Sequence, residues 1–149
     1  MKEIVLNKIA RTGLWPILIL CLACAGTGPA DKPENPPVET PSGLVYRVVH
    51  PGTGPVAKAG DKALIHETTR LQDGTVITDT WKLNFPIPFV VGGKQVIDGL
   101  DEAVRGMRVG ERRSLVVPPA LSKRSVYPDS ISPQDTLYYD VILLKVTKP

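Results

Sequence analysis

The chain of 149 residues has few of the side chains that carry most enzyme chemistry. It holds two histidines, His50 and His66, and two cysteines, Cys21 and Cys24. His66-Glu67 lacks the second histidine, four positions after the first, that a zinc-protease helix requires. The sequence also lacks a glycine-rich phosphate loop and a serine within an elbow motif. Nucleophilic, metal and nucleotide chemistry are therefore disfavoured, and we expect neither a metal ion nor a cofactor.

The chain also carries little net charge. The formal net charge is +3, and three basic residues against one acidic residue within positions 1–23 contribute +2 of it. The remaining +1 provides no basic surface for nucleic acid, so we expect no nucleic-acid partner. No internal repeat is visible at any period, which argues against a solenoid or a propeller. The length suits about one domain.

The apolar run near the N-terminus, residues 14–23, is too short to span a membrane. A spanning helix needs roughly 20 apolar residues, whereas a run of this length is typical of the central part of a signal peptide. The basic residues Lys2, Lys8 and Arg11 precede it, as in the positive first part of such peptides. We therefore predict a signal peptide over residues 1–23.

The run ends in Leu20-Cys21-Leu22-Ala23-Cys24, which resembles the lipobox of bacterial lipoproteins, although that motif prefers leucine where Cys21 stands. Three interpretations follow. The two cysteines form a disulfide, although cleavage between them would separate the partners. Alternatively, the chain is secreted and Cys24 stays unmodified. In the third interpretation Cys24 is acylated after cleavage. This predicts a lipid anchor in a bacterial cell envelope, with the domain facing the periplasm or the cell exterior.

Residues 24–41 have the composition of a linker, rich in glycine, proline and small or polar residues. Such a stretch buries little surface and stays extended, as a tether between a membrane and a domain requires. It can equally be a tail without a role. It has no apolar stripe of helical period through which two chains could pair, so we expect a monomer.

From Ser42 onward the sequence takes on the alternation typical of strands. Asp73-Gly74 predicts a hairpin, because glycine accepts the positive φ of a tight turn. The last strand is apolar on both faces for much of its length, which is typical of the centre of a sheet. The predicted strands cover residues 44–49, 62–71, 75–80, 89–91, 113–117 and 137–146.

One segment predicts a short helix. Asp98 is placed to cap its first turn, and Asp101 and Glu102 suit the positive N-terminal end. An apolar stripe at helical spacing follows, made of Leu100, Ala103, Val104 and Met107. The sequence therefore predicts an α+β domain over residues 42–148, in which five or so antiparallel strands wrap around one short helix.

An ordered set of short motifs runs through the predicted domain. They are Pro41-Ser42-Gly43-Leu44, Gly52-Thr53-Gly54, Ala59-Gly60-Asp61, Asp73-Gly74, Val96-Ile97-Asp98-Gly99-Leu100, Met107-Arg108-Val109-Gly110, Val117-Pro118-Pro119 and Leu137-Tyr138-Tyr139-Asp140. In this order and spacing they resemble the FKBP family of peptidyl-prolyl cis-trans isomerases, and the resemblance covers residues 41–146, essentially the whole predicted domain. The resemblance implies the FKBP fold and an apolar cleft that binds proline.

The resemblance also implies the residues of this cleft. Leu100 at the start of the helix takes the place of the pocket floor, Val96 and Ile97 lie on its approach, and Tyr139 takes the place of an aromatic wall. Other positions depart from the family pattern. Glu67 stands for a tyrosine, Ile77-Thr78 for Phe-Asp, Ile87 for an aromatic residue and Lys123 for the tyrosine that would bind a substrate carbonyl.

The implied activity is rotation of the peptide bond before proline in polypeptide substrates, here exported proteins. Resonance sets a barrier of about 18–20 kcal/mol, and a dry apolar pocket lowers it without a covalent step by favouring the twisted amide. The substitutions predict a weak isomerase. The alternative is a catalytically silent polypeptide-binding module of the same fold. Glu67 would need a partner if it is ionised in the cleft, and Lys123 is one candidate. In the alternative interpretation, Glu67 and Lys123 are solvated residues at the rim of the cleft.

Overall fold

The computed structural model describes residues 35–149, and these form seven strands, one α-helix and one 3-10 turn. The predictions for Cys21, Cys24 and the signal peptide therefore lie outside the described residues. In chain order the elements are β1 (Val38–Glu39), β2 (Val45–His50), β3 (Lys62–Arg70), β4 (Val76–Asp79), β5 (Ile87–Val90), α1 (Asp98–Val104), β6 (Arg112–Val117), η1 (Pro119–Leu121) and β7 (Leu137–Thr147).

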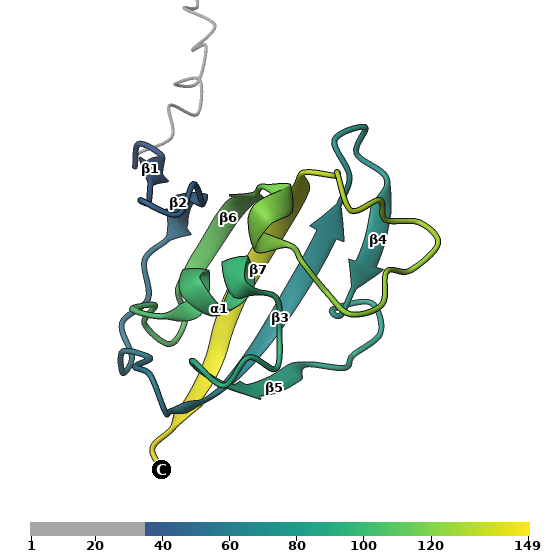
Figure 1. Cartoon of the computed structure of the whole chain (residues 1–149). Coiled ribbons are helices and arrows are strands. Elements are labelled where there is room, and N and C mark those ends of the chain that lie inside the picture. Colours follow the sequence, from purple (N-terminus) through teal and green to yellow (C-terminus); the bar gives the residue numbers. More distant parts are fainter. Residues whose placement is uncertain (1–34) are drawn as a thin grey trace, which may run out of the picture. The chain divides into compact units, whose positions relative to one another are not determined.

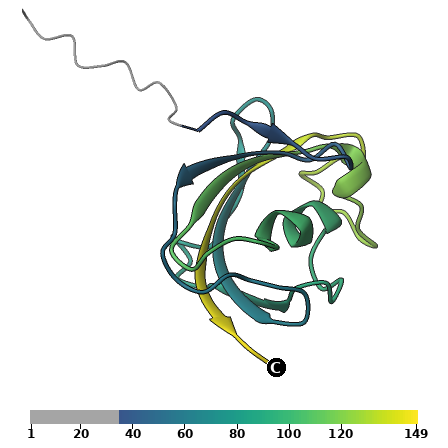
Figure 2. The same cartoon turned by 90° about the vertical axis from the view of Figure 1, so that its left-hand side faces the viewer.

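The strands form one antiparallel sheet in the order β1-β2-β6-β7-β3-β4 (Figure 1). Two strands share the outer edge of β3, since β4 pairs with Thr68 to Arg70 and β5 pairs with Lys62 to Ile65. Figure 2 shows the sheet curving around α1, which lies on its concave side. The α+β architecture that we predicted is confirmed, with about seven strands instead of five or so.

The core lies between α1 and the concave face of the sheet. Alternate residues of the two longest strands point into it, among them Ile65 of β3 and Leu143 of β7, both fully buried. Val104 and Met107 of the predicted helical stripe are also fully buried. The helix of seven residues is too short to be stable alone, so this packing holds it in place.

The start of α1 lies unusually close to β6. A Cβ atom added to Gly99 would come within 2.6 Å of Val117 Cγ1, so only glycine fits between the helix and that strand. This close approach fixes the position of the next residue, Leu100, which is 3% exposed.

The prediction that Asp98 caps this helix is wrong. Ile97 occupies the N-cap position without a side-chain hydrogen bond, and Asp98 is the first helical residue. Asp101 has a different role, because its carboxylate accepts hydrogen bonds from the backbone N–H of Gly92 at 2.7 and 3.0 Å. An acidic residue of the first turn thus ties the helix to the turn that follows β5.

Residues before Ser42, where we predicted the domain to start, already contact the sheet. Val38 and Glu39 form β1 against β2, and Asn35 Nδ2 donates to the carbonyl of Val48 at 3.1 Å. Both residues of β1 are exposed, so the strand has no apolar alternation by which the sequence could reveal it. In the part of the chain described by the structure, no helix has the length and apolar character needed to cross a membrane.

Candidate functional site

The predicted site residues lie on the concave face, around the N-terminal end of α1. The strand register places Thr78 of β4 beside Thr69 of β3, and Thr69 beside Tyr139 of β7. Glu67 is two residues from Thr69 on β3 and points to the same face. Leu100 and Tyr139 belong to the buried core, and four partly buried residues pack against this core, namely Ile77, Ile87, Val96 and Ile97.

The floor and wall residues of this site expose little surface. Leu100, Tyr139 and Glu67 are 3%, 6% and 7% exposed. Ile87 lies opposite Ile65 in the β3–β5 pair, which directs it to the core side. Lys123, in the connection between η1 and β7, is exposed instead. The structure thus brings the predicted apolar and acidic residues together and leaves Lys123 at the surface.

Glu67 is a buried carboxylic acid with an incomplete set of partners. Its Oε1 accepts one long hydrogen bond, 3.5 Å from the Thr69 hydroxyl, and its Oε2 is buried without a partner. Burial raises the pKa of Glu67 from 4.5 to about 7, against smaller opposing effects of the Thr69 hydrogen bond and the positive charge of Arg124. Near neutral pH this carboxyl is therefore partly protonated.

Arg124, and not Lys123, is the basic residue that acts on Glu67. Its charge lowers the pKa of Glu67, and its Nε donates to the carbonyl of Ser122 at 3.3 Å. Burial and then the charge of Glu67 raise the pKa of Tyr139, whereas a hydrogen bond from Arg124 lowers it. Lys123, the candidate partner that we named for Glu67, forms no ion pair with it among the described residues. The alternative of two solvated rim residues fits the exposed Lys123 but not Glu67, which is 7% exposed. Both cations follow the 3-10 turn η1, and of the two Lys123 is exposed and Arg124 is partly buried.

Two cavities flank Lys123 and Arg124 at the mouth of the site. One, of about 380 Å³, is lined by Lys94, Gln95, Val96, Ile97, Asp98, Lys123, Arg124 and Ser125. The other, of about 430 Å³, is lined by Pro119, Ala120, Lys123, Arg124, Tyr127, Pro133 and Gln134. Residues 35–149 contain no cluster of three or more His, Cys, Asp or Glu side chains that could hold a metal ion.

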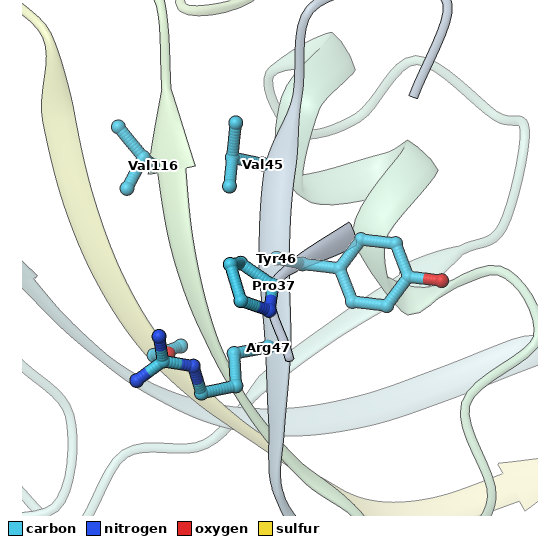
Figure 3. A pocket seen from close by; sticks show the side chains of 6 residues that line it. Pro37, Val45, Tyr46, Arg47 and Val116 are labelled. Atoms are coloured by element: carbon cyan, nitrogen blue, oxygen red, sulfur yellow. The ribbon is translucent and has the colours of Figure 1, made fainter. Parts of the chain in front are cut away.

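A third cavity lies apart from these residues, between β2 and β6. It measures about 210 Å³ and is lined by Pro37, Val45, Tyr46, Arg47, Ser114 and Val116. Figure 3 shows Pro37 in front of β2, with Tyr46 and Arg47 pointing to opposite sides of the strand. Arg47 Nε is buried there without a partner. None of the predicted site residues lines this cavity, so it is not part of the candidate cleft.

Sequence reasoning missed three residues that face the site or its mouth: Thr69, Arg124 and Lys94. Alternation along β3 could have identified Thr69, because it places this residue on the same face as Glu67. The other two lie in turns. No periodic pattern shows which way a turn directs its side chains, so the sequence held no signal for them.

The known proteins to which this chain is similar are consistent with one family. A family model described as FKBP-type peptidyl-prolyl cis-trans isomerase matches residues 54–144. The chain is 35% identical to an FK506-binding protein of Streptomyces anulatus, over 78% of this chain and 98% of that protein. It is 40% identical to the peptidyl-prolyl cis-trans isomerase Fkbp12 of Drosophila melanogaster, over 66% of this chain and 93% of that protein. Other relatives are longer, and the chain spans 31% of FK506-binding protein 4 of Dictyostelium discoideum.

Solved structures agree with this family. The crystal structure of FkpA from Escherichia coli is similar with a TM-score of 0.68 and 30% identity, over 75% of this chain and 52% of that one. The structure of AtFKBP13 is similar with a TM-score of 0.66 and 26% identity, over 75% of this chain and 99% of that one. The matched sequence, the sheet wrapped around one short helix and the grouping of residues at the start of α1 lead to one conclusion: the chain belongs to the FKBP-type peptidyl-prolyl cis-trans isomerases.

Proposed function

We propose that the protein is a weak prolyl isomerase that acts on exported proteins from a lipid anchor at Cys24 in a bacterial cell envelope. The observation that carries the activity is that Val96 and Ile97 pack against the core that contains Leu100 and Tyr139 and also line the cavity of about 380 Å³. Such a site can receive a proline ring, keep water away from the peptide bond and favour its twisted form.

The substitutions support low activity. Phe and Tyr side chains bury roughly 150–250 Å² each, so Ile77, Ile87 and Lys123 offer a proline ring less aromatic surface than the family pattern does. Each tenfold loss of rate corresponds to about 1.4 kcal/mol, so modest losses at several positions remove most of the activity. We expect weak binding of FK506, the ligand in the names of the relatives, for the same reason.

A second candidate function is polypeptide binding without catalysis. It is favoured by Glu67, whose buried carboxyl occupies the cleft side of β3 with one oxygen unpaired. A group of this kind opposes an apolar ring when it is ionised. An isomerase speeds the cis–trans isomerisation of peptides that contain proline, whereas a binding module binds such peptides without changing that rate.

The deciding experiment measures isomerisation of short Xaa-Pro peptides by the full chain in a mild detergent, alongside the triple variant Glu67→Tyr, Thr78→Asp and Lys123→Tyr. We expect low kcat/KM for the parent and about a tenfold or greater increase for the variant. Circular dichroism checks that both are folded. Absence of activity in both folded proteins would replace the isomerase with the binding module.

The anchor has a separate test with a matched control. Cys24→Ser should move the processed protein to the soluble fraction, because the acyl chains that hold it on a bilayer are missing. Cys21→Ser should leave the protein with the membranes, since Cys21 is removed with the signal peptide. A processed Cys24→Ser protein that still sediments with membranes would refute the anchor.

The oligomeric state has its own test. In detergent the protein should sediment as a monomer, and a dimer at micromolar concentration would refute that expectation.

A further inference from the structure

The mouth of the cleft has a strongly one-sided charge. Three of the eight residues that line the cavity of about 380 Å³ are cationic, namely Lys94, Lys123 and Arg124, and one is anionic, Asp98. Val96 and Ile97, on the approach to the cleft, line the same cavity. Ile97 and Asp98 stand at the start of α1, three and two residues before Leu100, so the cavity borders the end of the helix to which the proposed function assigns the proline.

Two of these cations, Lys94 and Lys123, have no acidic partner among the described residues, whereas the charge of Arg124 also acts on Glu67. Among the residues described by the structure, none of the ion pairs includes Lys94, Lys123, Arg124 or Asp98. Lys94 and Lys123 are exposed. Their charges are thus available to a ligand that enters the cavity.

The backbone holds Lys94 in an unusual position. Its φ is 53°, in the left-handed region that residues other than glycine seldom occupy. The turn is fixed from both sides, because Gly93 N–H donates to the carbonyl of Val90 at 2.8 Å and Val90 N–H donates to Gln95 Oε1 at 2.7 Å. Lys94 therefore projects from an anchored turn at the cavity.

We infer that this cavity binds the carboxylate of an acidic residue next to the substrate proline, so that the protein selects acidic prolyl segments. The inference rests on the proposed function and names its substrate class. Each exposed cation contributes little alone, but Lys94 and Lys123 around one carboxylate, with Arg124 beside them, should together give a selectivity of about fivefold at low salt. Screening should reduce it strongly near 1 M salt, where the Debye length falls to about 3 Å.

The test compares matched peptides with the full chain in mild detergent. Peptides with Glu directly before or directly after proline are paired with the same peptides containing Gln, which has the same shape without the charge. We expect the Glu peptide to have about a fivefold higher kcat/KM in at least one of the two positions, and a lower Kd in NMR titrations. The ratio of Glu to Gln should approach one in the double variant Lys94→Gln and Lys123→Gln.

The control is the double variant Lys62→Gln and Lys145→Gln, which also removes two charges, from exposed positions on β3 and β7 that do not line this cavity. It should keep the ratio of the parent. Equal kcat/KM and equal Kd for Glu and Gln peptides would overturn the inference and leave the isomerase standing. If the Glu peptide has the lower Kd but no peptide is isomerised, the protein is not an isomerase, and the acidic specificity belongs to a binding module instead. A ratio that falls equally in Lys62→Gln with Lys145→Gln would assign the effect to net charge and refute the cavity.

Discussion

Two glutamates lie equally deep in this domain, yet their surroundings differ. Glu111, just before β6, is 6% exposed and Glu67 is 7% exposed. Both oxygens of Glu111 have partners, since Oε1 accepts from Arg113 Nε at 2.6 Å and Oε2 accepts from the backbone N–H of Arg108 at 2.9 Å. Glu67 has one long hydrogen bond and one oxygen without any.

The difference separates a structural carboxylate from a functional candidate. Arg113 extends the Glu111 network, because its Nη1 donates to the carbonyl of Ala103 at 2.8 Å and its guanidinium lies 4.5 Å from the centre of the Tyr46 ring. This network joins the end of α1 to β6 and β2. The side chain of Glu67 does not connect separate elements of the fold in this way. A buried polar group that does not stabilise the fold calls for another explanation, and such groups concentrate at binding sites.

Removing the satisfied carboxylate should have the largest effect. Glu111→Gln leaves Arg113 buried without a counter-charge, which we expect to lower the free energy of unfolding by about 3 kcal/mol or more. Urea denaturation at pH 8 measures this change. Glu39→Gln, in exposed β1, is the control and should change stability by less than about 0.5 kcal/mol. Equal stability of the two variants would show that the Glu111 network does not hold the fold.

Glu67→Gln should give a smaller effect of opposite sign that depends on pH. The folded chain holds the Glu67 proton up to about pH 7, whereas the unfolded chain releases it near the ordinary pKa of 4.5. The free energy of unfolding should therefore be highest below pH 4.5, fall as the pH rises to 7, and lose on the order of 3 kcal/mol in total. Glu67→Gln should abolish this decline.

Urea denaturation between pH 5 and 8.5 tests the prediction, with Glu39→Gln expected to retain the slope of the parent. Asp61 and Asp73 do not interfere, because hydrogen bonds hold their pKa values below the ordinary 3.8 and their contributions are lost only at lower pH. An unchanged slope in Glu67→Gln would mean that this carboxyl ionises in the folded protein as it does in the unfolded chain.

The two glutamates also show how much of the structure could be predicted from the sequence. Strand alternation, the apolar run of β7 and the stripe of α1 predicted the sheet and the helix, because each depends on a local pattern alone. Glu67 was placed in the cleft only by the resemblance to the FKBP family, which has a tyrosine at its position. The charge of Arg124 acts on Glu67, and because Lys123 and Arg124 are adjacent in an irregular connection, no period distinguishes them. The strand β1 was missed for a similar reason, since exposed Val38 and Glu39 show no pattern.

The smallest effect should come from Thr69→Val, which removes the remaining hydrogen bond of Glu67 while keeping the shape of the side chain. The bond is long at 3.5 Å and lowers the pKa of Glu67, so its loss should raise that pKa further above about 7. Stability above pH 7 should fall by about 0.5–1 kcal/mol, the usual contribution of a single hydrogen bond. Thr68→Val is a close control, because Thr68 is similarly buried at 6% exposed but points to the other face of β3. An NMR titration of the Glu67 side-chain carboxyl follows both variants. The midpoint should rise in Thr69→Val alone, and a midpoint that falls there, or rises equally in Thr68→Val, would show that Thr69 does not stabilise the ionised carboxylate.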